Sequence, residues 1–351
     1  MTWNGLRQLP RVRRHCLAVV VAGATIAVLA PVRGASADAP PSAATTDPSW
    51  LTSVNEYRSM AGLAPVAQDP QLSAGDHDHS CYMLLNGMSH DELPDRAGYT
   101  ERGDLAGNSG NVAVSSDIAA TDRSFVDLWM TGPFHALGLL RPNLETVGFG
   151  TCTNPTTSFQ AGATLDVIRG LGPTVRQSAP VMFPGAGSTT TLTEFVAETP
   201  NPLTFCGWTG PAGLPIVVLM PERFTSGVTA SVTGPSGPLE LCVLSKHNTT
   251  GDARTLLAGN DVVVAIPRNP LTAGTYTVSV ASSARNVDWS FVVAGAAADP
   301  ATAAPAVAEQ ASQSAATDAT QAPATRVTRP VGSLFASVLA KTWMFRALAG
   351  S

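Results

Sequence analysis

Two histidines, His90 and His135, are the residues of this chain whose types and surroundings point most clearly to chemistry. His90 follows a glycine that should end a helix, in the run Asn86–Glu92, and His135 lies just inside a helical turn begun by Pro133. Imidazole changes its charge near neutral pH and is a common metal ligand. If the fold brings both rings to one cleft, that cleft is where function should be sought.

The first 37 residues resemble a secretory signal peptide. Arginines precede an apolar run, Leu17–Ala30, and Ala35-Ser36-Ala37 provides a small-residue cleavage site. The apolar run is too short to span a bilayer comfortably. We therefore expect residues 1–37 to be removed and the mature chain to be secreted, extracellular or located in the cell envelope.

Charge excludes one class of partner. Residues 1–37 hold five of the 21 basic residues and none of the 26 acidic ones, so the expected mature chain keeps 16 basic residues and has a formal charge of −10. A chain of this sign repels nucleic-acid phosphates, and we expect no nucleic-acid partner.

Four cysteines remain after the expected cleavage, because Cys16 leaves with the signal peptide. An even number of cysteines in an exported protein indicates disulfides, and four allow three connectivities. Proximity along the chain favours the pairs Cys81–Cys152 and Cys206–Cys242.

Composition divides the mature chain into two folded regions and two linkers. Residues 38–47 and 296–330 are rich in Ala, Pro, Ser and Thr without a usable apolar period, which predicts disordered linkers. The regions between them are 48–175 and 180–295, and the texture of the sequence changes near residue 180.

The first region should mix helices with short strands. Three apolar patterns have helical spacing and two have the length of strands. The expected helices run from Asp47-Pro48 to Gly62, from Asp69-Pro70 to Gly87, and from Ser116 through Ile118 to Trp129, and the expected strands are Thr146–Thr151 and Ala163–Ile168.

The second region alternates apolar and polar residues over short runs separated by Gly and Pro. This pattern predicts an all-β, immunoglobulin-like antiparallel sandwich. No cluster of histidines or charged residues inside it looks catalytic, so we interpret it as a binding or spacer module. The expected strands are Leu214–Leu219, Val228–Val232, Leu239–Leu244, Val262–Ile266, Thr275–Ala281 and a last strand through Val287 to Val293.

Residues 331–351 form an apolar C-terminal segment. Within it, 331–348 carries only Lys341 and Arg346 as charged residues. One interpretation is an amphipathic helix that contacts a membrane surface or a partner. The other is a loosely ordered terminus.

An ordered series of motifs resembles the CAP superfamily, which comprises cysteine-rich secretory, antigen 5 and pathogenesis-related proteins. The series is His90, Asn111-Val112-Ala113, Trp129-Met130, His135 and Val147-Gly148-Phe149-Gly150. It is most similar to the bacterial secreted form of the family, and an excess of arginine over lysine also favours a bacterial source. The resemblance implies an α-β-α sandwich, so the whole chain should be α+β, with a CAP-type domain followed by the β-sandwich.

The resemblance also implies a cleft that holds two histidines and, in many members, two acids. Here both usual acids are missing, because Ser109-Gly110-Asn111 stands where the family has Gly-Glu-Asn and Gly132 stands where many members have the second acid. Glu92 or Asp127 would have to provide replacement oxygens. We therefore take His90, His135, Glu92, Asp127 and Asn111 as the candidate cleft residues.

Two imidazoles with one or two carboxylates would suit zinc, so His90 and His135 are candidate Zn²⁺ ligands. The alternative is that the two rings hydrogen-bond to their own surroundings or to water. A second histidine pair, His77 and His79, projects to different sides of its expected helix, which predicts a buried His79 and a solvated His77.

The sequence favours a non-enzymatic binder, and the resemblance implies a lipid or another amphiphilic or cell-envelope ligand. A metal-dependent hydrolase is the first alternative, but Ser89 directly precedes His90 and the chain has no Gly-x-Ser-x-Gly or His-Glu-x-x-His motif. The second alternative is a structural envelope protein with a degenerate cleft, which the missing acids favour.

Overall fold

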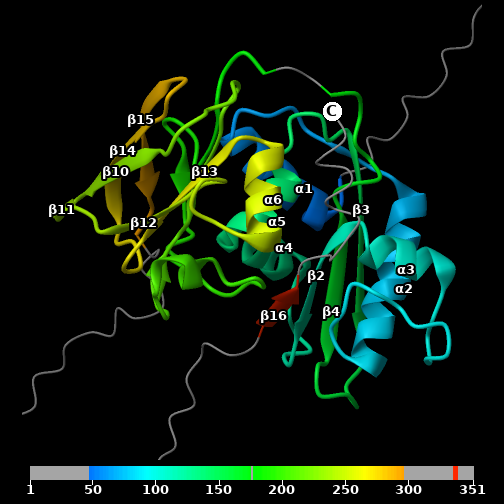
Figure 1. The fold of residues 1–351 in the computed structure, drawn as a ribbon. Helices are drawn as coiled ribbons and strands as arrows, with labels where there is room; N and C mark the ends of the chain where they lie inside the picture. The colour runs from blue at the N-terminus through cyan, green and yellow to red at the C-terminus, as the bar shows by residue number, and fades with distance from the viewer. Residues whose placement is uncertain (1–46, 175–176, 296–334, 339–351) are drawn as a thin grey trace, which may run out of the picture. The chain divides into compact units, whose positions relative to one another are not determined.

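The computed structural model describes residues 47–174 and 177–295, together with the backbone of one strand, β16 (Phe335–Val338) (Figure 1). The expected signal peptide (1–37), nearly all of the first linker and the whole second linker (296–330) lie outside the described residues.

A central sheet organises the first region. Its strands are β1 (Ala67–Gln68), β2 (Gly110–Ser115), β3 (Thr146–Thr153) and β4 (Ala161–Asp166), in the order β1-β3-β4-β2 with β16 at the edge. The pairs β3–β4 and β2–β4 are antiparallel, whereas β1 and β3 are parallel. The two strands expected from the sequence, at 146–151 and 163–168, correspond to β3 and β4.

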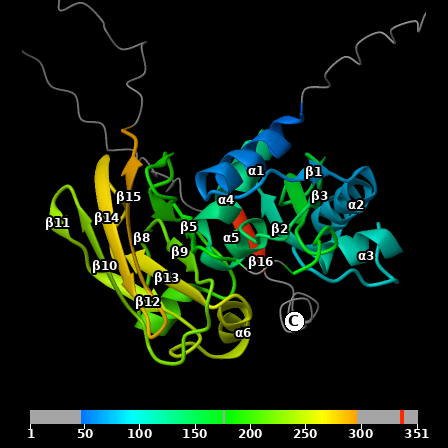
Figure 2. The same cartoon turned by 90° about the horizontal axis from the view of Figure 1, so that it is seen from above.

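Helices cover both faces of this sheet (Figure 2). One face carries α1 (Ser49–Met60), α4 (Asp122–Thr131) and α5 (Pro133–Leu139), and the other carries α2 (Pro70–Asn86) and α3 (Glu101–Gly107). Because successive strand residues point to opposite faces, β2 supplies both layers. Its Val112 and Val114 pack with Met83 and Leu84 of α2, while its Ala113 belongs to the larger core. The expected α-β-α layering is therefore present.

Helix α2 begins and ends where the sequence predicts. The Asp69 side chain accepts hydrogen bonds from the backbone N–H groups of Gln71 and Leu72, which is the usual role of an N-cap acid. At the other end Gly87 has φ +94°, a conformation that glycine adopts without a steric penalty. His79 is buried on this helix and His77 is exposed, as expected.

The third expected helix begins later than the sequence analysis placed it. Asp117 caps a turn by accepting a hydrogen bond from the Ala119 N–H at 2.9 Å, so Ile118 lies in a loop and is 44 % exposed. The helix starts at Asp122, where the Thr121 hydroxyl accepts from the Ser124 N–H. Local side-chain capping of the backbone therefore overrides the apolar spacing at Ile118.

Arg58, on α1, holds the loop between α5 and β3. Its buried guanidinium donates to the backbone carbonyls of Ala64, Leu139, Arg141 and Leu144 at 2.6–3.3 Å. Burial lowers the pKa of Arg58 to about 10, so the group stays protonated at neutral pH. One side chain thus joins the first helix to the segment that follows His135.

The second region is β-rich and contains several sheets. Its two larger sheets have the strand orders β11-β10-β14-β15-β6 and β12-β13-β9-β5, and β7 pairs with β8. The strands are β5 (Val181–Phe183), β6 (Thr189–Thr190), β7 (Glu194–Phe195), β8 (Ala212–Gly213), β9 (Ile216–Leu219), β10 (Thr229–Gly234), β11 (Gly237–Pro238), β12 (Leu241–Leu244), β13 (Val262–Pro267), β14 (Gly274–Ala281) and β15 (Asn286–Val293).

Two short helical segments accompany these strands, a 3₁₀ helix η1 (Pro202–Cys206) and the helix α6 (Gly251–Gly259). The sequence does not predict α6, because the glycines at both of its ends are typical of turns. Its Ala253, Leu256 and Leu257 are buried at helical spacing, so packing stabilises a helix that propensity alone would not specify.

The two regions share one hydrophobic core. A single cluster of buried apolar side chains runs from α1 through the central sheet into the β-rich sheets. At the boundary, Tyr57 of α1 meets Phe183 of β5 edge-on, with ring centroids 5.8 Å apart. The described residues from Asp47 onward accordingly form one compact unit.

Both expected disulfides are confirmed. Cys81–Cys152 joins α2 to β3, and Cys206–Cys242 joins η1 to β12, with Cα–Cα distances of 5.1 and 5.8 Å.

Within the described part of the chain, no helix has the length and apolar composition needed to cross a membrane.

The C-terminal segment differs from the expected amphipathic helix where the structure describes it. Phe335–Val338 forms β16, which pairs antiparallel with β2 so that Val338 lies opposite Val112. The open edge of β2 offers backbone donors and acceptors, and pairing satisfies them better than a helix would. The remainder of 331–348 lies outside the described residues.

Asp76 is the least satisfied charged side chain of the first region. It is fully buried between α2 and the sheet, and neither carboxylate oxygen has a hydrogen-bond partner. Burial, and next the negative charge of Asp166, raise the pKa of Asp76 well above its ordinary value of 3.8. Folding therefore favours the protonated acid, and this contribution to stability is lost as pH rises through the raised pKa.

We expect Asp76→Asn to stabilise the protein increasingly as pH rises. Its free energy of unfolding should be close to that of the wild type near pH 4 and higher by about 1–2 kcal/mol at pH 8. Urea unfolding between pH 4 and 8 measures the difference. Asp78→Asn is the matched control on the same helix. Asp78 is partly buried, but hydrogen bonds from Arg102 and Thr100 lower its pKa, so its ionisation changes stability only below about pH 4. Asp78→Asn should therefore lower the free energy of unfolding by a nearly constant amount between pH 4 and 8. A pH-independent effect of Asp76→Asn would contradict the interpretation.

Candidate functional site

His135 lies in the first turn of α5 and is 1 % exposed. Its Nδ1 is 2.8 Å from Oε2 of Glu198, which comes from the β-rich region. An ionised carboxylate can only accept hydrogen bonds, so Nδ1 must carry the hydrogen of the ring. This hydrogen bond joins the first turn of α5 to the β-rich region.

The same carboxylate accepts from the backbone of α5. The Phe134 N–H donates to both oxygens of Glu198 at 3.1 Å, and the His135 N–H donates to Oε2 at 3.1 Å. These N–H groups belong to the first turn, where a helix has no internal acceptor for them. The Glu198 side chain is fully buried, and its charge is compensated by these two N–H groups together with His135 Nδ1.

His90 is 4 % exposed and hydrogen-bonds to the end of α3. Its Nδ1 is 2.6 Å from the carbonyl oxygen of Gly107, so Nδ1 again carries the hydrogen. Strand β2 begins at Gly110 and is buried along its whole length. Its Asn111 donates from Nδ2 to the His135 carbonyl at 3.1 Å. The segment from Gly107 to Asn111 therefore contacts His90 through its first residue and His135 through its last.

Glu92 pairs with His79. Its Oε1 lies 3.0 Å from His79 Nδ1, and His79 Nε2 lies 2.8 Å from the carbonyl oxygen of Ser89. Because the carbonyl can only accept, Nε2 carries a hydrogen, and a second proton must lie between Nδ1 and the carboxyl group. Glu92 also accepts from the Thr100 N–H at 2.9 Å. This buried, net-neutral pair fixes the loop that carries His90.

Asp127 takes part in a different network. Its Oδ1 accepts from the Tyr57 hydroxyl at 2.6 Å and from Arg123 Nε at 2.9 Å, and Arg123 also pairs with Glu56. Burial, and next the charge of Asp127, raise the pKa of Tyr57. The two acids expected to replace the missing cleft oxygens are thus engaged with His79 and with Tyr57.

Glu198 is the site residue that the sequence analysis missed. It is the one acid in the run Phe195-Val196-Ala197-Glu198-Thr199-Pro200 and belongs to no recognisable motif. It lies 63 positions from His135 in the sequence. A single acid in an apolar surrounding was the only available signal, and it does not identify a partner.

The donor set does not fit a zinc ion. Structural and catalytic zinc sites use at least three protein ligands. Within residues 47–174 and 177–295, no three or more His, Cys, Asp and Glu side chains are grouped so that they could hold a metal. The nearest acid to His135 is hydrogen-bonded to its Nδ1 and to helix N–H groups.

A hollow of about 350 Å³ lies beside the His90 loop. It is formed by the C-terminal turn of α2 and the residues that follow, and Ser89 and Asp91, the neighbours of His90, line it. Its lining combines apolar and charged side chains: Tyr82, Asn86, Gly87, Met88, Ser89, Asp91, Leu93 and Arg96.

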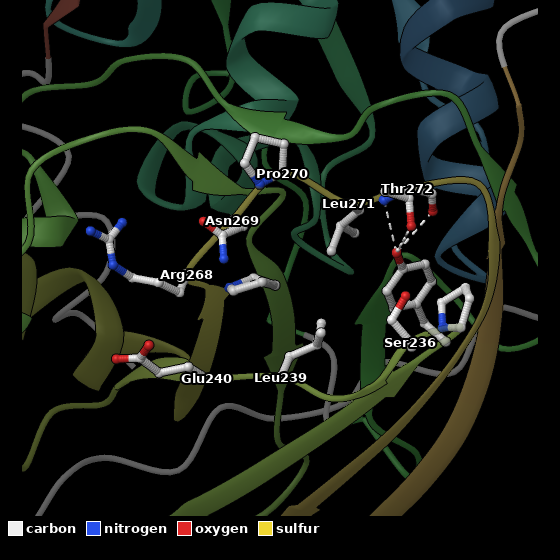
Figure 3. Close-up of a pocket in the computed structure, with 12 residues that line it drawn as sticks. Ser236, Leu239, Glu240, Arg268, Asn269, Pro270, Leu271 and Thr272 are labelled. Atoms are coloured by element: carbon white, nitrogen blue, oxygen red, sulfur yellow. Dashed lines mark hydrogen bonds between the residues drawn. The ribbon is translucent and has the colours of Figure 1, made fainter.

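A second hollow, of about 280 Å³, lies in the β-rich region (Figure 3). The Tyr276 hydroxyl donates to the Thr272 carbonyl at 2.8 Å and accepts from the Thr272 N–H at 2.9 Å. Figure 3 shows Arg268 and Glu240 directed away from Thr272. The guanidinium of Arg268 lies over Trp208, 5.1 Å from the ring centroid, and donates to the Pro211 carbonyl. The lining of this hollow includes three prolines and two leucines, namely Pro235, Pro267, Pro270, Leu239 and Leu271.

We expect the described residues, 47–174 and 177–295, to form no defined zinc site. Calorimetric titration with Zn²⁺ at pH 7.5 should reveal no one-to-one binding tighter than about 10 µM at His90 and His135, because three protein ligands do not converge among these residues. The melting temperature should be unchanged by a chelator. Tight stoichiometric binding that disappears in both His90→Ala and His135→Ala would show this expectation to be wrong.

Comparison with known proteins identifies the first region. Residues 51–165 match the family described as CAP, the cysteine-rich secretory protein family. No curated protein matches the chain. Among solved structures, the copper resistance protein PcoC from Escherichia coli matches with 21 % identity and a TM-score of 0.20, over 34 % of this chain and 99 % of that one, which is too low to define the fold of the second region. Residues 51–165 therefore form a CAP domain, which contains both histidines and the Cys81–Cys152 disulfide.

Proposed function

We propose that this protein is an exported, non-enzymatic binder of an amphiphilic ligand, such as a lipid of the cell envelope, and that the ligand occupies the hollow beside His90. The observation that carries the proposal is the composition of that hollow. It is the place where the CAP domain offers apolar and charged side chains together next to one of its two histidines.

The apolar part of the hollow suits a hydrocarbon chain. Tyr82 and Met88 contribute to its wall, and the Leu93 side chain, 51 % exposed, adds apolar surface that a ligand can cover. Covering such a surface with a ligand gains about 25 cal/mol per Å² of apolar area. A lipid tail is the ligand part that supplies this area.

The polar part of the hollow suits a headgroup. Arg96 and Asp91 place opposite charges on its rim, and Ser89 adds a hydroxyl group. Opposite charges at one rim favour a zwitterionic headgroup over a simple anion, because each charged group of the ligand then meets its counterpart. A zwitterionic amphiphile is therefore the first probe.

The setting of the domain supports export. Two disulfides are formed, as is typical of proteins in oxidising compartments, and the expected mature chain has a charge of −10. The β-rich region, for which an immunoglobulin-like arrangement remains our proposal, would act as a binding or spacer module. Residues 331–348 remain a candidate for contact with the membrane surface.

The proposal predicts binding of monomeric dodecylphosphocholine to the full mature chain. Leu93→Asp should weaken this binding at least about tenfold, because it removes apolar contact and places a charge beside the ligand tail. Nuclear magnetic resonance titration measures the affinity and shows whether the shifted signals belong to residues 82–96. Mass spectrometry of a solvent extract of the purified protein would identify the natural ligand.

Leu105→Asp is the matched control, because Leu105 is also exposed, at 44 %, but does not line the hollow. It should bind the amphiphile like the wild type. An empty extract together with unsaturable binding, or an equal loss in both variants, would overturn the proposal.

A further inference from the structure

Glu198 reaches His135 from outside the CAP domain. The match to the CAP family ends at residue 165, and Glu198 lies between β7 and η1 of the β-rich region. Its neighbours Val196 and Thr199 are exposed, whereas Glu198 is buried, so the chain directs this one acid inward.

Both ends of this short segment are fixed. On one side β7 pairs with β8, with Phe195 opposite Ala212. On the other side Asn201 caps η1 by accepting from the Leu203 N–H, and the Cys206–Cys242 disulfide joins η1 to β12. The β-rich region therefore determines where the Glu198 side chain lies.

The CAP domain leaves room for this acid. A Cβ atom at Gly132 would lie 2.7 Å from Glu198 Oε2, which is closer than real Cβ contacts, and 3.1 Å from its Cδ, which is tighter than most of them. Any side chain at position 132 would therefore displace the carboxylate. The absence of a side chain at 132 and the presence of an acid at 198 are two parts of one arrangement.

The Glu198 carboxylate accepts hydrogen bonds from the Phe134 N–H, the His135 N–H and the His135 ring. A purely structural anchor would need only the two backbone N–H groups of α5. The additional bond with His135 Nδ1 has a chemical effect, because a carboxylate acceptor 2.8 Å from Nδ1 favours the tautomer with the hydrogen on that nitrogen.

We propose that Glu198 is a positioning residue for His135, supplied by the β-rich region, and that it sets the tautomer and orientation of this histidine. The state of the CAP histidine site then depends on a segment beyond the family domain. This inference goes beyond the amphiphile proposal and requires no ligand to be bound.

The test is the tautomer of His135 in the full mature chain labelled with ¹⁵N in its histidine rings. The wild type should show His135 with the hydrogen on Nδ1. In Glu198→Ala the tautomer ratio should move at least about tenfold toward Nε2–H, the size expected for losing a hydrogen bond to a charged acceptor. Glu198→Asp, which keeps a carboxylate, should retain part of the Nδ1–H signal. Adding acetate to Glu198→Ala should restore part of it.

His90 provides the internal control, because its Nδ1 is bonded to the Gly107 carbonyl and should keep its hydrogen in every variant. An unchanged His90 signal also shows that the variant is folded. If Glu198→Ala does not fold, Glu198→Met, which fills the same space without an oxygen acceptor, supplies the same measurement. A His135 tautomer that stays on Nδ1 in folded Glu198→Ala or Glu198→Met would overturn the inference. Because no amphiphile is present, this result is independent of the test at Leu93.

Discussion

The requirement that a buried carboxylate receive hydrogen bonds governs how the two regions of this protein meet. Glu198 is withdrawn from water completely, and leaving it without donors would cost several kcal/mol. It obtains them from two backbone N–H groups of the first turn of α5, which have no acceptor inside their own helix, and from the His135 ring. The same contact thus satisfies the buried acid and the helix N–H groups, and it joins the CAP domain to the β-rich region.

The same requirement explains the surroundings of the other buried polar groups. Arg58 remains charged in the core because four carbonyl oxygens receive its N–H groups. His79 and Glu92 neutralise each other beneath the His90 loop. Asp76 is the exception, and it responds by favouring its protonated form rather than by finding a donor. Compensation of charge thus fixes the loops around both histidines.

Local signals in the sequence were sufficient for much of the fold. The Asp69 cap and the stop at Gly87 define α2, and alternating residues define β14 and β15. The disulfide pairs followed from proximity along the chain. The start of α4 was misplaced because the side chain of Asp117 forms a turn in an apolar pattern, and α6 was missed because its stability comes from packing.

The sequence by itself was enough to recognise the motifs of the CAP domain, the β-rich character of the second region and the two histidines as candidate site residues. Only the tertiary structure decided what those histidines touch. Glu92 and Asp127 were plausible partners by their distance along the chain, yet they bind His79 and Tyr57, and the acid at His135 is Glu198. Capping and periodicity act between neighbours in sequence, whereas a buried charge is satisfied by whichever donors the folded chain brings to it.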